Sequence, residues 1–165
     1  MSMIDSLIRE FENEALTTRK HFERLPDEKL DWRPHEKSFT AGGLASHITD
    51  LMRFADLIFS TDECDFDPAV HKPYHATSVA ELLQTFDDNV RNGKQAMAGI
   101  ADDDIMQPWR FKVMGRLLFE RPRAISFRDF ALSHQIHHRG QFSVYLRLLN
   151  VPVPGSYGPS ADEQG

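Results

Sequence analysis

Four stretches of this chain carry apolar residues three and four positions apart, the spacing that places side chains on one face of an α-helix. The stretches cover residues 2–25, 40–60, 78–100 and 126–150. At 1.5 Å per residue, helices of this size span roughly 30 to 37 Å, so the four match one another in length. Amphipathic helices of equal length bury their apolar faces together, and the pattern therefore predicts an all-α protein built as a four-helix bundle.

Polar residues that cap helices stand near three of the predicted helix starts. They are Ser38 or Thr40, Ser78 and Ser126. An acidic residue follows Ser78 and Ser126 after three positions, which is the reciprocal capping-box pattern. We therefore expect the last helix to begin at Ser126 and to run to Asn150.

The remaining segments lack a helical period. Residues 61–77 contain two prolines among polar residues and predict a long irregular loop, a kind of segment that is often functional. Between Trp109 and Phe119, apolar and basic residues alternate before a glycine, which favours a short extended segment or a hairpin. The tail 151–165 holds three prolines and three glycines and cannot be helical. We expect residues 1–165 to form a single domain, with this tail either trailing in solvent or folding back over the bundle.

Composition narrows the classes of function. The 19 Lys and Arg residues against 25 Asp and Glu leave a formal net charge of −6, which repels phosphate backbones and anionic lipid, so we expect no nucleic-acid partner. No apolar run approaches the roughly 20 residues that span a bilayer, and the N-terminus lacks a signal-peptide pattern. The single cysteine, Cys64, cannot form an intrachain disulfide, which fits a reducing compartment, and we expect a cytoplasmic protein.

Three histidines form a candidate metal site. His134 and His138 lie one turn apart and continue the apolar face of the last predicted helix. His71 and His75 have the same spacing but lie in the predicted loop, where residues four positions apart need not be neighbours in space. On the second predicted helix, His47 shares the apolar face and is the only other histidine expected to point into the core. If the second and last helices run parallel, as in an up-down-up-down bundle, the three rings meet at one level. Three neutral imidazoles then hold a divalent metal with open positions; alternatively, each ring is a core residue hydrogen-bonded within the protein.

The neighbours of these histidines have roles that the pattern leaves open. Gln141, three residues after His138, either hydrogen-bonds a metal-bound water, or simply packs in place or bonds the backbone. Asp50, about one turn after His47, either accepts the spare ring N–H of that histidine or faces solvent. Gly140 stands inside a predicted helix, where it is unfavourable, and indicates close approach of a neighbouring element.

The last predicted helix also carries a family signature. Residues 134–141 read HQIHHRGQ, which resembles the HxxxHRGQ motif of the DinB and YfiT-like metalloenzymes. The segment DWRPHEKSFTAGGLASHI, ending at His47, is similar to the stretch before the first histidine of that family, and GSYGPSADE is similar to its usual ending. The resemblance implies a DinB-type four-helix bundle in which His47, His134 and His138 bind one divalent transition metal per chain. Nickel and zinc are the metals it favours, and iron or manganese occur in some members.

The resemblance also implies a chemistry. Some members are thiol-dependent S-transferases or isomerases that use bacillithiol, mycothiol or glutathione, several are homodimers, and many have no assigned reaction. It favours an enzyme whose metal activates a small thiol or water for attack on an electrophilic small molecule. Two alternatives stay open: a metal-dependent hydrolase, and a non-catalytic metal-binding or stress-response protein. No feature of the sequence selects the metal, the thiol or the substrate.

Overall fold

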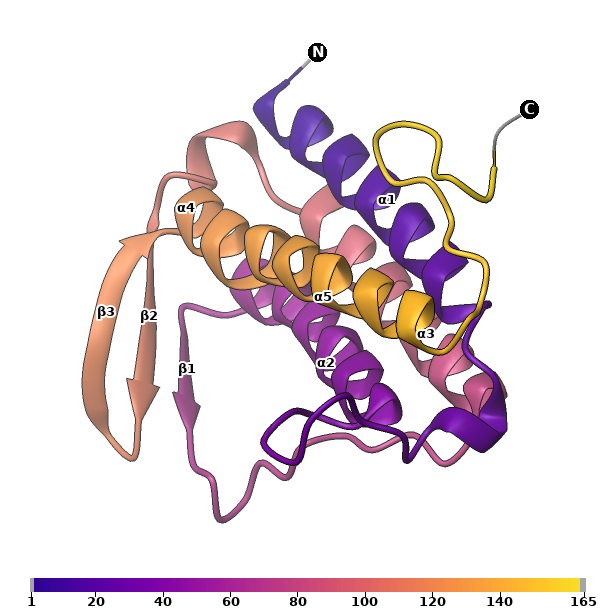
Figure 1. Ribbon diagram of the computed structural model, residues 1–165. Coiled ribbons are helices and arrows are strands. Elements are labelled where there is room, and N and C mark those ends of the chain that lie inside the picture. The colour runs from indigo at the N-terminus through magenta and orange to yellow at the C-terminus, as the bar shows by residue number, and fades with distance from the viewer. Residues whose placement is uncertain (1, 164–165) are drawn as a thin grey trace.

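The helices expected from the sequence are present in the computed structural model, which describes residues 2–163. They are α1 (Met3–Phe22), α2 (Ala41–Ser60), α3 (Val79–Ala98), and a last unit made of α4 (Arg123–Phe127), a π-helical segment (Arg128–Ser133) and α5 (His134–Leu148). The predicted four-helix bundle is confirmed (Figure 1). Met1 and the last two residues of the predicted tail lie outside the described range. Within that range, no helix is both long and apolar enough to cross a membrane.

The directions of the helices differ from the expected up-down-up-down arrangement. α1 packs against α3 and α5, and α2 packs against the same two helices (Figure 1). α1 and α5 run parallel, because Glu10 pairs with Arg128 at one end while Thr18 bonds Gln135 further along both helices. α2 and α3 are also parallel and run opposite to the first pair. The bundle is therefore up-down-down-up.

The expected parallel pairing of the second and last helices is wrong. His47 lies against His138, whereas Phe54, further along α2, lies against Phe130, which precedes α5. The two helices are thus antiparallel, and the histidine rings meet because His47 lies where α2 crosses the His134–His138 turn of the last helix. Since α2 and α3 are parallel, the segment 61–77 must return along the whole length of the bundle, which explains why this connection is so long.

Local capping sets where the long helices begin. The hydroxyl of Thr40 accepts from the backbone N–H of Gly43 at 3.0 Å, and the hydroxyl of Ser78 accepts from that of Glu81 at 3.1 Å. The capping box predicted at Ser78 is only half formed, because the Glu81 carboxylate accepts from the backbone and hydroxyl of Thr77 instead. Ser2 caps α1 with a complete capping box, in which the Asp5 carboxylate accepts from the backbone N–H of Ser2.

The last helix is not capped at Ser126, so that prediction is wrong, and its middle contains the π-helical segment. It begins at Arg123, and Ser126 is buried inside its first turns. Asp129 forms an ion pair with Arg121 rather than closing a capping box. The Arg123 guanidinium donates to the backbone carbonyls of Ile58 and Thr61, which satisfies the C-terminal end of α2 and joins the two helices.

A three-stranded sheet covers one end of the bundle, at the left of Figure 1. Its strands are β1 (Glu63–Phe66), β2 (Pro108–Val113) and β3 (Arg116–Pro122). β2 and β3 form the predicted hairpin, whose turn contains Gly115 at a φ of 77°. β1 pairs parallel to β2 and lies inside the segment predicted to be irregular, so that prediction is wrong for Glu63–Phe66. Four residues were too few to show a period, and their partner strand lies more than 40 residues away in the sequence.

Two helical glycines differ in their surroundings. A Cβ added at Gly93 would lie 2.7 Å from the Cβ of Ala55, so this glycine lets α3 approach α2 closely. A Cβ added at Gly140 would meet no heavy atom within 4 Å. The close approach predicted at Gly140 is therefore wrong, and this position faces open space.

Candidate metal centre

Three histidine rings converge where α2 crosses α5. The centroid of the His47 ring lies 5.3 Å from that of His134 and 4.7 Å from that of His138, and the latter two are 4.8 Å apart. One ring nitrogen from each residue lies within 4.8 Å of the others. The structure thus brings together the three histidines named from the sequence, as a cluster that could hold a metal ion.

A hydrogen bond orients one of these rings. The Nδ1 atom of His138 donates to the Oε1 atom of Gln141 at 2.7 Å, an assignment in which its Nε2 lone pair stays free. Partners of this kind set the tautomer of metal-binding histidines and fix the direction of their lone pairs. Gln141 therefore contacts the His138 ring directly.

The surroundings of the cluster keep the imidazoles uncharged. Burial is the main effect and, together with the neighbouring His138 and His47, lowers the pKa of His134 to about 4. Burial also lowers the pKa values of His47 and His138, and for His47 the nearby Asp50 partly opposes this effect. Neutral imidazole is the form that binds a metal, so the donor set fits a divalent transition metal at neutral pH.

Asp50 lies beside the cluster but is hydrogen-bonded elsewhere. Its carboxylate accepts from the backbone N–H of Tyr74 at 2.9 Å and so ties the segment 61–77 to α2. None of the hydrogen bonds within residues 2–163 joins it to His47, and the orienting role predicted for it stays a prediction. The predicted functional loop is thus attached next to the three histidines.

The other histidines lie outside the cluster. His137 is exposed, and the His71 ring stacks on Phe66 at 5.3 Å. His21 is fully buried on α1, with Nδ1 2.8 Å from the backbone carbonyl of Thr17. The expectation that His47 is the only other inward histidine is wrong for His21. The sequence signal that could have indicated the burial of His21 is its position next to Phe22, at the end of the apolar stripe.

A cavity of about 440 Å³ opens beside the three histidines. His47 and His134 line one part of it, and the Phe130 ring lies 6.4 Å from the His134 ring, so the cavity adjoins the cluster directly. Its apolar walls come from α2, the sheet and the π-helical segment and consist of Leu51, Phe54, Phe66, Phe111, Val113 and Phe130. Its polar lining, which the sequence did not reveal, includes Arg53, His71 and Lys72. A small molecule in this space would reach the histidines.

The π-helical segment contributes to the site. A π-helix inserts an extra residue into a turn, and such bulges often occur at functional sites. Here the segment ends at Ser133, directly before His134, and it includes Phe130, which lines the cavity. The irregular turn therefore positions one histidine of the cluster and one wall of the cavity.

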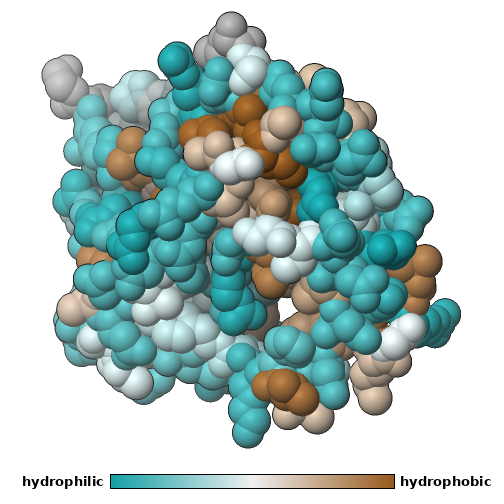
Figure 2. Space-filling view, turned by 180° about the vertical axis from the view of Figure 1, so that it is seen from behind, coloured by the Kyte–Doolittle hydropathy of each residue, from teal (hydrophilic) through white to brown (hydrophobic). Residues whose placement is uncertain are grey.

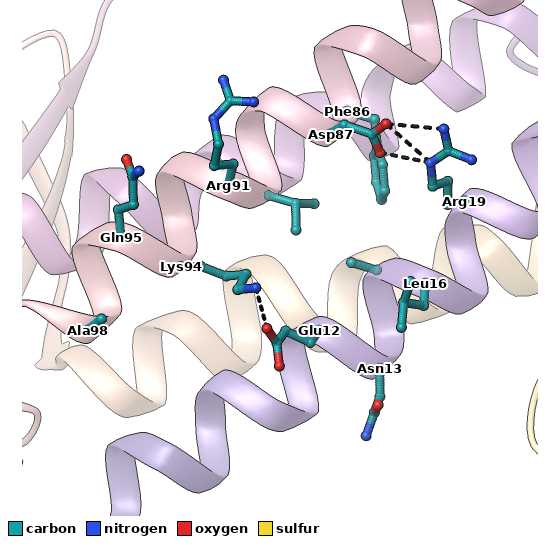
Figure 3. A pocket seen from close by; sticks show the side chains of 12 residues that line it. Glu12, Asn13, Leu16, Arg19, Phe86, Asp87, Arg91, Lys94, Gln95 and Ala98 are labelled. Atoms are coloured by element: carbon teal, nitrogen blue, oxygen red, sulfur yellow. Dashed lines mark hydrogen bonds and ion pairs between the residues drawn. The ribbon is translucent and has the colours of Figure 1, made fainter.

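A larger hollow of about 700 Å³ lies between α1 and α3, away from the histidines. Two ion pairs, Lys94 with Glu12 and Arg19 with Asp87, cross it (Figure 3). The face of the molecule seen from behind is mostly hydrophilic, with apolar side chains gathered in a patch between polar ones (Figure 2). This hollow contains no histidine or cysteine and so carries no comparable chemistry.

Known proteins resemble this chain over nearly its whole length. The uncharacterized protein YrdA of Bacillus subtilis (strain 168) is 29% identical over 164 residues, which cover 97% of this chain and 91% of YrdA. The uncharacterized protein YjoA of the same organism is 23% identical over 160 residues, covering 90% of this chain and 92% of YjoA.

Solved structures share the fold. A DinB-like protein from Bacillus cereus ATCC 10987 superposes with a TM-score of 0.75 at 23% identity, covering 93% of this chain and 97% of that one. The crystal structure of YjoA, a DinB-like protein, gives a TM-score of 0.69 at 17% identity, covering 97% and 99%. The profile of the DinB superfamily matches residues 10–142, and that of the DinB family matches residues 126–164. With most of its length matched, and with the three histidines brought together, this chain belongs to the DinB superfamily.

Proposed function

We propose that this chain binds one divalent transition metal, nickel or zinc, through His47, His134 and His138, and transfers a small thiol to an electrophilic small molecule. The observation that carries the proposal is the convergence of three neutral imidazoles beside a cavity that reaches them. A divalent ion held there supplies a Lewis acid that lowers the pKa of a thiol towards neutrality.

The number of protein ligands favours catalysis over a purely structural site. Structural zinc sites are closed by four protein ligands, whereas catalytic sites keep a position open. Within residues 2–163, no cysteine, aspartate or glutamate joins the three histidines in the cluster. The adjoining cavity provides the space in which a substrate would meet the open position.

The residues around the cluster orient the ligands and exclude water. Gln141 holds the ring of His138, and the Phe130 ring lies edge-on against that of His134. Asp50 holds the backbone of Tyr74 and thereby keeps the loop next to the cavity, whose aromatic walls exclude water from the reaction. In the transfer, the thiol sulfur forms a bond to the electrophilic carbon, the leaving group departs with its bonding electron pair, and the thiol proton passes to solvent.

Metal content is the first test. Tag-free protein purified without added metal or chelator is analysed by elemental mass spectrometry, and we expect about one equivalent of a transition metal per chain. His134→Ala is expected to lose the metal. His137→Ala, which removes an exposed histidine of the same helix, is the matched control and is expected to retain it. Wild-type protein that contains no metal and takes none up would reject the proposal.

The reaction is tested separately. Metal-loaded protein is incubated with a chloroarene and with bacillithiol, mycothiol or glutathione, and the thioether conjugate is measured by mass spectrometry. We expect conjugate with at least one thiol, and none after metal removal or in His134→Ala. If no thiol gives a metal-dependent conjugate, the transferase is rejected, and hydrolysis is then assayed with ester and amide substrates.

We also propose that the protein acts in the cytoplasm as a homodimer. Cys64 is a free, half-buried thiol, which suits a reducing compartment. Val144 and Leu148 on α5 are each 55% exposed and form apolar surface that a second copy would cover. Gel filtration with light scattering at two concentrations measures the mass, and a monomer at both would contradict the dimer.

A further inference from the structure

The cavity beside the histidines contains two positively charged side chains that form no ion pair within the described residues. Arg53 on α2 and Lys72 on the loop both line it, and both are exposed. Within residues 2–163, neither side chain takes part in an ion pair or a hydrogen bond, although most arginines of the chain do. The one carboxylate in the lining, that of Asp50, accepts from the Tyr74 backbone. The two cations outnumber this one carboxylate, so the lining has a formal net charge of +1 in a protein whose formal net charge is −6.

The cavity that these charges share with His47 and His134 has aromatic walls. The ring of Phe130 lies 4.5 Å from that of Phe54 and 4.9 Å from that of Phe111, and it also faces His134. Flat apolar walls of this kind favour a flat apolar ligand, and polar groups in such a pocket fix its orientation. The cavity thus combines aromatic walls, two exposed cationic side chains at its mouth, and the histidines His47 and His134.

We propose that the electrophilic substrate of this site is an amphipathic organic acid, whose apolar body packs against Phe54, Phe111 and Phe130 while its acid group pairs with Arg53 and Lys72. The inference rests on the proposed function for the reaction itself, but binding of the acid depends only on residues of the cavity. A guanidinium forms two hydrogen bonds with a carboxylate, and the ammonium of Lys72 adds a second charge. Bound in this way, the acid group lies at the mouth, and the apolar body extends towards the histidines.

Binding of 2-naphthoate is compared with binding of the neutral 2-naphthalenemethanol by isothermal titration calorimetry, with metal-free protein and without thiol. We expect the wild type to prefer the acid. Arg53→Gln and Lys72→Gln are each expected to weaken naphthoate binding about fivefold, the effect of losing a charged hydrogen bond at an exposed site. Binding of the alcohol should change less than twofold. Arg9→Gln, an exposed arginine on α1 outside the cavity, is the matched control and should behave as the wild type.

Three results would overturn the proposal. The first is equal affinity of the wild type for the acid and the alcohol. The second is naphthoate binding that requires metal and is insensitive to Arg53→Gln and Lys72→Gln, since the acid would then bind the ion. The third is that Arg53→Gln and Lys72→Gln weaken the binding of glutathione but not that of naphthoate, which would mean that the two cations bind the thiol substrate. The calorimetric titration of naphthoate is done without metal or thiol, so it can detect acid binding even if the transferase assay gives no product. The proposal of acid binding and the proposal of thiol transfer are therefore tested separately.

Discussion

Arg139, the residue directly after His138, donates a hydrogen bond of 2.6 Å to the carboxylate of Glu14 on α1. Both side chains are buried, with 3% and 12% of their surfaces exposed. The hydroxyl of Tyr157, from the C-terminal tail, bonds both partners at 2.8 and 3.0 Å. The face of α5 opposite the histidines is therefore held against α1, which sets the rotation of the helix. The described part of the tail folds back over the bundle.

Breaking this buried ion pair should destabilise the fold strongly. Glu14→Gln leaves Arg139 charged and without its counter-charge, and we expect the free energy of unfolding to fall by about 3 kcal/mol in urea titrations. Glu12→Gln, on the same helix, removes the partner of Lys94 in an exposed ion pair and should cost less than about 0.5 kcal/mol. Equal effects of the two substitutions would contradict a special role for the buried pair.

Gly140→Ala should stabilise the protein. Alanine favours a helix over glycine by about 1 kcal/mol, and a Cβ at this position meets nothing within 4 Å. Gly93→Ala should destabilise it, because the new Cβ would collide with that of Ala55. Thermal unfolding of both variants tests the contrast. A lower melting temperature for Gly140→Ala would mean that another chain or segment packs against this face.

The metal-free protein should lose stability as the pH falls below about 6.5. The folded state holds the pKa of His134 at about 4, below the ordinary value of 6.5, so the unfolded state binds more protons between these values. The contribution is fully present above pH 6.5 and is lost as the pH falls towards 4. Urea unfolding between pH 7 and 5 measures this decline, which should be smaller in His134→Gln. His75→Gln, in the exposed loop, should decline as the wild type does.

Gln141→Ala should weaken metal binding without abolishing it. The amide holds the His138 ring through a hydrogen bond of 2.7 Å, and loss of such a partner typically costs about 10- to 100-fold in metal affinity. Competition with a chromophoric zinc chelator measures the affinity. Gln95→Ala, on the exposed side of α3, is the control. Unchanged affinity in Gln141→Ala would show that packing, not this hydrogen bond, orients His138.

Features that depend on neighbouring residues were predictable from the sequence. The apolar stripes of the long helices, the caps at Thr40 and Ser78 and the β2–β3 hairpin arise from interactions within a few residues. The same holds for the pairing of His134 with His138, because one helical turn separates them. These local rules place two histidines together before any fold is known.

Four amphipathic helices, and the helix faces that carry His47, His134 and His138, follow from the amino-acid sequence. The antiparallel course of α2 and α5, the pairing of Glu63–Phe66 with β2, and the meeting of Arg53 and Lys72 in one cavity arise from the packing of the folded chain. Each of these features depends on contacts between residues far apart in the chain. The energies of such contacts cannot be deduced from the pattern of residues in a short stretch of sequence. The irregular turn before His134 has the same origin: packing between the last helix, α2 and the sheet outweighs the preference of those residues for a regular helix.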